Sequence, residues 1–220
     1  MKITPSHIIR AIIYFLGIVI TGLGINTLLR SALGAGAWDT VIYNLRAFIT
    51  TILNLNVTLG TVSFIIYLLV LAFVMIYNKK LKYLIVFVPI FGISLAIDFW
   101  DIVVFGNYFP TALWLRGLFY LIGTFILTMG LALIIVTRYP AMVFDELTLL
   151  LMRLFKSISF FKTRILIEVF AIILATLFGF LSHIGFGAVN FGSLILALII
   201  GPLIEFQLKV LTRATNTLFQ

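Results

Sequence analysis

Six long apolar stretches dominate the sequence. A helix needs about 20 residues to cross a hydrocarbon core of about 30 Å, and each stretch is close to or above that length. Their approximate bounds are Ile9–Leu29, Leu59–Tyr77, Tyr83–Val104, Thr111–Val136, Ile165–Ser182 and Phe191–Leu211. The pattern predicts an all-α, polytopic transmembrane bundle of about six spans, formed by a single integral membrane domain over residues 1–220.

Two shorter apolar segments lie between these stretches, at Trp38–Leu53 and Ala141–Phe155. Each opens on acidic residues, follows glycine or proline, and carries one arginine. Neither makes a good independent span, because making either one cross would move later basic clusters to the wrong side of the membrane. We expect each to form either a broken, re-entrant half-helix or an amphipathic helix at the membrane interface, and the sequence leaves both forms open.

Composition supports a membrane environment and excludes several kinds of chemistry. The chain is 63% hydrophobic and 10% charged, with a mean hydropathy of +1.27, whereas soluble domains are about a quarter charged. The absence of cysteine excludes disulfides, cysteine-ligated zinc and iron–sulfur clusters. No nucleophile triad, P-loop or H-E-x-x-H motif is present, so we expect no enzyme activity, cofactor or metal site.

The distribution of basic residues predicts an orientation. The net charge is +8, and with six spans 12 of the 15 Lys and Arg residues fall on the side of the N-terminus. Only Arg30, Arg46 and Arg116 fall on the other side. The positive-inside rule therefore predicts that both termini are cytoplasmic. The basic residues lie between apolar stretches and form no dense patch, so we expect the lipid bilayer and no nucleic acid as a partner.

The two halves of the chain resemble each other, which predicts an internal repeat. At an offset of 106 residues the matched pairs are Gly17 and Gly123, Gly24 and Gly130, Ala35 and Ala141, and Asp39 and Asp145. At an offset of 107 they are Asp39 and Glu146, Arg46 and Arg153, and Asp98 and Glu205. Three spans per half is an odd number, so the second repeat, about 113–213, is expected to be inverted relative to the first, about 9–107. Many secondary transporters have this architecture, although a duplicated bundle without transport is the alternative.

The segment Gly22–Leu45 resembles the YczE/YitT-like family of small bacterial membrane proteins, which carry a motif close to L-G-x-G-P-W-D after the first span. The matching residues are Leu33, Gly34, Gly36, Trp38 and Asp39, while Ala37 replaces the proline. The acidic ends of the third and sixth spans, around Asp98 and Glu205, also resemble family positions. The resemblance implies a multi-pass protein of the bacterial cytoplasmic membrane with a transport role.

Three features indicate candidate substrate-binding residues. The starts of the short segments would present free N–H groups to an anion if they lie within the membrane. In each short segment an acid and an arginine seven residues apart share one helix face. The third and sixth spans each contain a carboxylate, which costs about 2.5–3.5 kcal/mol inside a membrane and is therefore usually paired or functional. The candidates are Gly34, Gly36, Trp38, Asp39, Arg46, Asp98, Asp145, Glu146, Arg153 and Glu205. The alternatives are helix caps, solvated charges and side chains that reach the interface.

Three functions fit these patterns. The first is a secondary transporter or permease for a small polar or anionic solute, with its site between the two repeats near the starts of the short helices. The second is a vitamin-type substrate-binding membrane subunit, in which Gly17, Gly22 and Gly24 of the first span would form a docking face. The third is a membrane scaffold or assembly protein that transports nothing. A homodimer or a partner subunit fits all three.

Overall fold

A computed structural model describes residues 5–140, 142–155 and 159–215 of the chain, and these ranges contain helices but no strand. Ala141, which opens the second short segment and matches Ala35 in the repeat, lies outside the described residues. Six helices are long and apolar enough to cross a membrane. The chain is therefore a multi-pass, all-helical membrane protein, as the hydrophobic pattern predicts.

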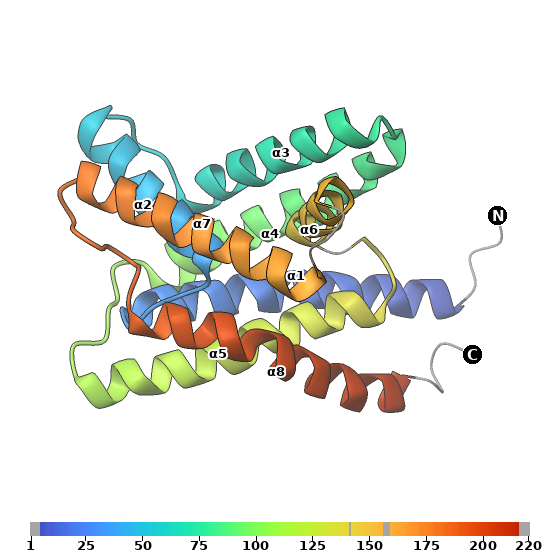
Figure 1. Ribbon diagram of the computed structural model, residues 1–220. Coiled ribbons are helices and arrows are strands. Elements are labelled where there is room, and N and C mark those ends of the chain that lie inside the picture. Colours follow the sequence, from blue (N-terminus) through green and yellow to red (C-terminus); the bar gives the residue numbers. More distant parts are fainter. Residues whose placement is uncertain (1–4, 141, 156–158, 216–220) are drawn as a thin grey trace.

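Five of the six spans are single helices, and the third is composite. The single helices are α1 (Pro5–Ser31), α3 (Leu59–Asn78), α5 (Leu113–Val136), α7 (Phe160–Leu181) and α8 (Phe191–Thr215). The third span joins a 3₁₀ helix, η1 (Leu81–Val86), to α4 (Phe87–Asp98) and then to a π-helix, η2 (Phe99–Phe105). The six spans lie side by side, with both termini at one end of the bundle (Figure 1). We call this the terminal end and the other the opposite end.

The two predicted short segments form two short helices, α2 (Ala37–Ile52) and α6 (Val143–Leu154). Helix α1 finishes at the opposite end, the chain turns back, and α2 starts between the two ends and runs outward again (Figure 1). Helix α6 follows α5, which finishes at the terminal end. The first turns of both helices meet, because the rings of Trp38 and Phe144 stack at 4.4 Å. Helix α2 therefore fits the re-entrant form, whereas α6 is seen nearly end-on in Figure 1 and lies across the long spans.

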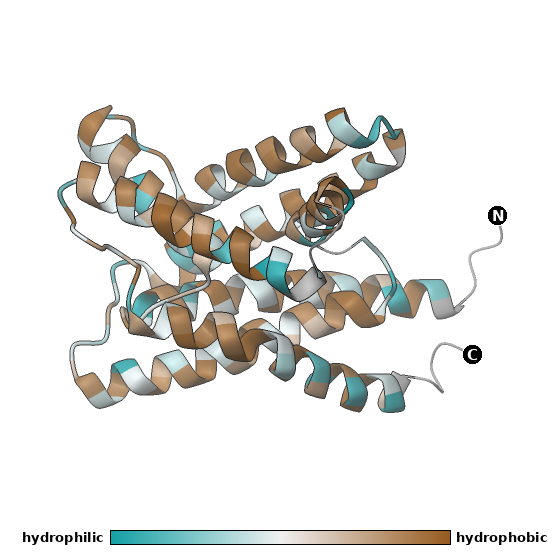
Figure 2. Cartoon of the chain, in the orientation of Figure 1, coloured by the Kyte–Doolittle hydropathy of each residue, from teal (hydrophilic) through white to brown (hydrophobic). Residues whose placement is uncertain are grey.

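The outer surface of the bundle is apolar along its middle. Leu69, Phe125 and Leu198 are among the large apolar side chains that point outward and are more than half exposed. Hydrophobic residues dominate the central parts of the long helices, and hydrophilic residues gather toward the two ends (Figure 2). A soluble protein does not expose apolar surface on this scale, so this belt fits the hydrocarbon core of a bilayer.

Helices α1 and α5 cross at close range, and small residues make this possible. A side chain at Gly17 would collide with Ile134, and one at Gly123 would collide with Leu28. A second pair of close contacts follows the same pattern, because Gly24 packs against Leu127 and Gly130 packs against Thr21. In each case the two contacts are related by the offset of 106 residues that the sequence predicts for the repeat. Small residues allow backbones to pack closely inside a membrane, where van der Waals contact is a main source of stability.

The last span is packed differently from the third. Helix α4 packs against both α1 and α3, whereas α8 packs mainly against α5. The contact between α5 and α8 includes a hydrogen bond from the Tyr120 hydroxyl to the Gly192 carbonyl at 2.6 Å. Because η2 continues directly from α4, the packing of α4 places η2 beside the end of α1. No equivalent element lies beside the end of α5 in the described part of the chain.

Candidate functional site

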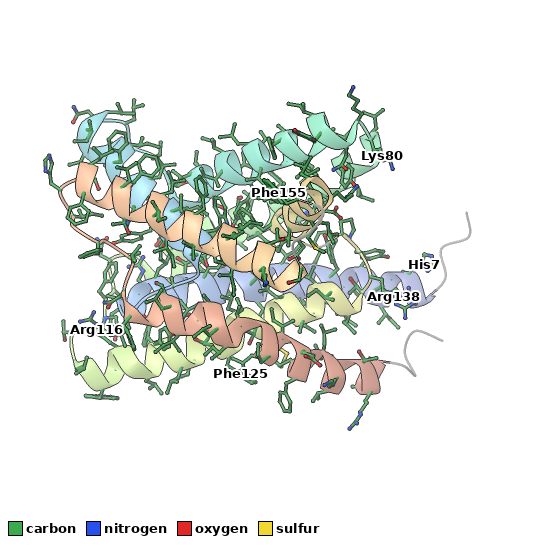
Figure 3. The ribbon with its side chains drawn as sticks, viewed as in Figure 1. His7, Lys80, Arg116, Phe125, Arg138 and Phe155 are labelled. Carbon is green, nitrogen blue, oxygen red and sulfur yellow. The ribbon has the colours of Figure 1, made fainter. Side chains whose placement is uncertain are left out.

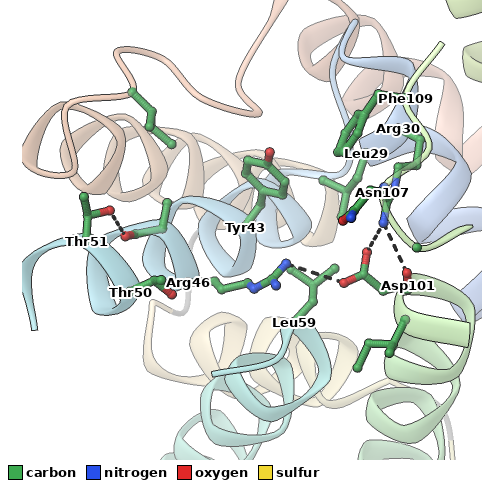
Figure 4. A pocket seen from close by; sticks show the side chains of 14 residues that line it. Leu29, Arg30, Tyr43, Arg46, Thr50, Thr51, Leu59, Asp101, Asn107 and Phe109 are labelled. Atoms are coloured by element: carbon green, nitrogen blue, oxygen red, sulfur yellow. Dashed lines mark hydrogen bonds and ion pairs between the residues drawn. The ribbon is translucent and has the colours of Figure 1, made fainter. Parts of the chain in front are cut away.

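A cavity of about 620 Å³ lies at the opposite end of the bundle, where α1, α2, α3 and η2 come together. Its charged side chains are Arg30, Arg46 and Asp101, and the two arginines approach Asp101 from different sides (Figure 4). Tyr43 and Asn107 add polar groups to the wall. We call this space the arginine cavity.

Arg30 is held rigidly at the end of α1. Its side chain is only 5% exposed, and its Nη2 lies 2.5 Å from Oδ1 of Asp101. Its Nη1 donates to the Tyr108 carbonyl at 3.0 Å, and its guanidinium lies 4.3 Å from the centre of the Phe109 ring. A buried guanidinium needs such compensation for lost hydration, and this set supplies it. Arg30 therefore shapes the cavity and contributes fixed positive charge.

The π-helix η2 supplies the partner of Arg30. The Asp101 carbonyl also accepts a hydrogen bond from Nη2 of Arg30, at 3.2 Å. A π-helix shifts the register of backbone hydrogen bonds, so a carbonyl can point away from the helix axis toward another donor, and such segments are frequent at functional sites. Asp101 thus binds Arg30 through both its side chain and its backbone.

Arg46 is the more accessible of the two arginines. Its side chain is 38% exposed, and its Nη1 lies 3.4 Å from Oδ2 of Asp101. Its Nε donates to the Val57 carbonyl at 3.1 Å, which fixes the stem of the side chain. No described residue accepts a hydrogen bond from Nη2 of Arg46. The Asp101 carboxylate carries one negative charge against two guanidinium groups, so the cavity retains an excess positive charge and free donors.

A buried amide fixes the position of α2, and with it Arg46. The Nδ2 of Asn44 donates to the carbonyls of Ala175 in α7 and Phe186 in the following loop, at 2.8 and 3.0 Å. Its Oδ1 accepts from the N–H of Ala188 at 3.0 Å. Because Asn44 lies two residues before Arg46, these bonds hold the part of α2 that faces the arginine cavity.

A layer of three aromatic side chains lies at the meeting point of α2 and α6. Trp38 stacks on Phe144, and the Tyr67 ring contacts Phe144 edge to face with centres 5.4 Å apart. We call these residues the aromatic layer. Trp38 also lines a second, apolar cavity of about 280 Å³ among α3, α6 and α7, together with Leu147 and Leu151. Helix α2 therefore contacts both cavities, the apolar one through its first turn and the arginine cavity through its later turns.

Asp39 lies in the first turn of α2 and is buried, with 8% of its surface exposed. Helix α2 is not one of the six spans. Burial raises the pKa of Asp39 to about 7, the nearby Glu168 carboxylate adds to this rise, and a hydrogen bond with the Gly36 backbone opposes it. No described basic side chain forms an ion pair with Asp39. The acid therefore has a backbone partner but no countercharge.

Asp145, in the first turn of α6, is paired through Arg164 of α7. The Nη1 of Arg164 lies 2.7 Å from Oδ1 of Asp145, and its Nε lies 3.0 Å from Oε1 of Glu168. Arg164 and Glu168 are four residues apart on one helix, whereas Asp145 reaches Arg164 only through the packing of α6 against α7. Folding also brings Glu168 close enough to Asp39 for its charge to raise the pKa of Asp39. Glu146 is half-buried, and no described residue forms a hydrogen bond or ion pair with it.

The two predicted glycines shape the return of the chain before α2. Gly34 has a φ of +128° and packs against the start of α8, where a side chain would collide with the backbone of Ser193. The hydroxyl of Ser193 accepts from the N–H of Ala35 at 3.1 Å. Gly36 caps α2, and a side chain there would meet the Asp39 carboxylate. Both glycines therefore support the site without lining the arginine cavity.

The remaining predicted residues lie elsewhere. Asp98 accepts hydrogen bonds from the Thr58 hydroxyl and the Gly60 N–H, both at 2.6 Å, and so ties the end of α4 to the start of α3. Arg153 is exposed and donates to Asn78 Oδ1 at 3.0 Å. Glu205 is 70% exposed and pairs with Lys209. The structure does not bring these three residues to the arginine cavity, and of the predicted residues it places only Arg46 there.

Sequence reasoning missed two of the three charged residues of the cavity. Arg30 is interpretable from sequence only as an outer loop charge, and Asp101 only as a marker of the membrane interface. One signal could have found the pair, because both are charges at the ends of spans that are otherwise apolar. Their pairing depends on α1 and η2 lying side by side.

Comparison with known proteins assigns the chain to a family. A family model described as "Family of unknown function (DUF6198)" matches residues 8–209. The chain belongs to this DUF6198 family. It is also similar to the "Uncharacterized protein YyaS" of Bacillus subtilis (strain 168), with 24% identity over 200 residues that cover 91% of this chain and 92% of the relative. No solved structure matches it.

The DUF6198 match includes every residue that lines the arginine cavity, from Leu29 to Ile184. It assigns no function to them. The narrower resemblance to YczE/YitT-like proteins stays a prediction.

Proposed function

We propose that this DUF6198 protein transports a small anion, such as a carboxylate or a phosphate, and that the arginine cavity is where the anion binds. The observation that carries the proposal is the convergence of Arg30 and Arg46 on the single carboxylate of Asp101 within a cavity of about 620 Å³. A guanidinium presents a planar fork of donors that matches a carboxylate or phosphate. Arg46 is the residue that would bind the solute.

The arrangement of the two cavities supports a transport path. The arginine cavity lies at the opposite end, and the apolar cavity is lined by Trp38 of the aromatic layer, so a path that joined the two cavities would have to pass this layer. Transport then requires Trp38 and Phe144 to separate. Their stacking joins two short helices, and the loop before α2 can act as a hinge.

We also propose that the two halves are inverted repeats related by a pseudo-two-fold axis between α1 and α5. The reciprocal glycine contacts and the meeting of α2 with α6 support this. For orientation, His7, Lys80 and Arg138 lie toward the terminal end and Arg116 lies at the opposite end (Figure 3). With the charge count, this supports a terminal end in the cytoplasm and an arginine cavity that faces outward, which fits the bacterial cytoplasmic membrane that the YczE/YitT-like resemblance implies.

A vitamin-type binding subunit is less well supported. That function would need Gly17, Gly22 and Gly24 of α1 to be free for docking onto a partner. Gly17 and Gly24 are already covered by α5, and Gly22 is covered by Ala96 in α4. A transporter that works without a partner needs no such face.

The test is uptake by purified protein reconstituted alone into liposomes. The probes are radiolabelled acetate, succinate and inorganic phosphate, added at the side of the arginine cavity. We expect uptake of at least one of them, and we expect Arg46→Gln to reduce its apparent affinity by about tenfold to a hundredfold, because a charge-assisted hydrogen bond is worth about 1.5–3 kcal/mol.

The matched control is Arg153→Gln, which removes the equivalent arginine of α6, far from the arginine cavity, and should leave uptake unchanged. Equal uptake by the native protein and Arg46→Gln would contradict the proposal. So would equal losses in the two variants, because a general structural effect would then explain both.

A further inference from the structure

Asp39 is a buried acid whose charge nothing neutralises. It is more than nine-tenths buried, and no described Lys, Arg or His pairs with it. Two side chains from neighbouring helices interact electrostatically with Asp39, Glu168 from α7 and Tyr67 from α3. An ionised carboxylate without a countercharge is costly inside a protein, so such a group tends to bind a proton or a cation.

The surrounding cluster is short of positive charge. The cluster contains three carboxylates, those of Asp39, Glu168 and Asp145, and Arg164 is the basic side chain that forms ion pairs within the described part of it. Arg164 bonds with Glu168 and Asp145, and it forms no ion pair with Asp39. The side chains of Arg164 and Asp145 are 31% and 40% exposed, so the cluster extends from a solvated edge to the buried acid.

The geometry suits a proton better than a metal ion. In the part of the chain that the structure describes, no three or more His, Cys, Asp or Glu side chains stand where they could hold a metal ion. Sodium or a divalent cation takes several oxygen ligands, whereas a proton needs one carboxylate and an acceptor. The buried donor Trp38 Nε1, next to Asp39 in the chain, has no hydrogen-bond partner among the described residues.

We propose that Asp39 and Glu168 form a proton-binding site at the start of α2, reached from the terminal end past Asp145 and Arg164. Asp39 binds the proton, and its release leaves the Asp39 carboxylate ionised, with the Glu168 charge nearby and no countercharge. The raised pKa of Asp39 agrees with this.

Helix α2 links this site to the arginine cavity, because Arg46 lies two turns, or about 10 Å, beyond Asp39 on the same helix. Resting on the transport function proposed above, proton binding at Asp39 would then couple to anion binding at Arg46. The proton site does not depend on that function.

The experiment uses Trp38 as a reporter and needs no transport. The chain has three tryptophans, so the double variant Trp100→Phe and Trp114→Phe leaves Trp38 as the only one. Its fluorescence is followed in detergent from about pH 5 to about pH 9, a range wide enough for a raised carboxyl pKa. We expect one transition near neutrality, which Asp39→Asn should remove.

Glu168→Gln should move the transition to lower pH by roughly one unit, because a like charge beside Asp39 is lost. Glu205→Gln is the control and should change nothing, since Glu205 is 70% exposed and pairs with Lys209. A transition that survives Asp39→Asn would overturn the proposal. If Asp39→Asn does not fold, the Glu168→Gln variant decides, and an unchanged midpoint overturns the proposal.

Failure of the transport assay with an intact Trp38 transition would overturn the proposed function and leave the proton site standing. Anion transport without a Trp38 transition would overturn the proton site and leave the proposed function standing.

Discussion

The two short helices begin alike and end in different surroundings. Both have an acid in the first turn and an arginine seven residues further on, and their first turns touch through Trp38 and Phe144. Arg46 of α2 lies in a cavity and faces Asp101. Arg153 of α6 lies at the surface and bonds with Asn78. Similar sequences have therefore produced one candidate binding site and one surface contact.

The difference comes from the neighbours of each helix. At the repeat offsets of 106 and 107 residues, Arg30 corresponds to Val136, and Asp101 corresponds to Leu208. In addition, α4 packs against α3 and carries η2 to the end of α1, while α8 packs mainly against α5. The second half thus lacks both the charges and the packing that build the arginine cavity. Of the two halves that we propose to be repeats, only the first carries this cavity.

The largest expected difference between α2 and α6 is all-or-none labelling. The chain has no cysteine, so single cysteine variants report one position each. With the proposed orientation, a membrane-impermeant maleimide should label Thr50→Cys, whose residue lines the arginine cavity, in intact cells. It should label Arg153→Cys only after the membrane is opened. Labelling of both variants from the same side would contradict the placement of Thr50 and Arg153 at opposite ends of the bundle.

The next largest difference is expected in the stability lost when the acid that pairs with an arginine is removed near each short helix, Asp101 near α2 and Asp145 in α6. Asp101→Asn leaves the buried Arg30 without its countercharge, and breaking a buried pair costs about 3–5 kcal/mol. Asp145→Asn breaks a pair that is about a third exposed, which costs about 0–1 kcal/mol. The free energy of unfolding in mixed micelles measures both. Equal losses would mean that the Arg30–Asp101 pair is not the stronger constraint.

The smallest difference is expected for the repeat-matched acids Asp98 and Glu205. Asp98→Asn weakens two hydrogen bonds that hold the start of α3, with an expected loss of about 1–2 kcal/mol in the free energy of unfolding. Glu205→Gln should cause no measurable change, because its partner Lys209 is exposed with it. The same unfolding measurement checks both, and a greater loss for Glu205→Gln would show that α8 has a partner surface that the single chain does not reveal.

Much of the fold could be predicted because the bilayer imposes simple rules. All six predicted spans are confirmed as long apolar helices, and the two short segments are confirmed as helices α2 and α6 within a few residues of their predicted bounds. A run of about 20 apolar residues has few alternatives in a membrane, since its backbone must satisfy its own hydrogen bonds. The composite third span was less predictable, because a π-helix such as η2 has no clear pattern of its own.

The candidate site was harder to predict than the fold. Asp98, Arg153 and Glu205 are charged residues matched by the repeat, as Arg46 is, yet none of these three lies in the arginine cavity. Arg30 and Asp101, which do, are 71 residues apart in the chain. Repeat matching correctly favours charged residues as a class but does not show which charges come together.

Hydrophobic pattern and charge were enough to predict a helical membrane protein of six spans with two short helices, because each of these features is a local property of the chain. Three things depended on how the helices pack against one another. These are the meeting of the first turns of α2 and α6, the pairing of Arg30 with Asp101 through η2, and the approach of Glu168 to Asp39. Electrostatic interactions depend on distance and burial, and residues far apart in the chain acquire both only when the helices are assembled.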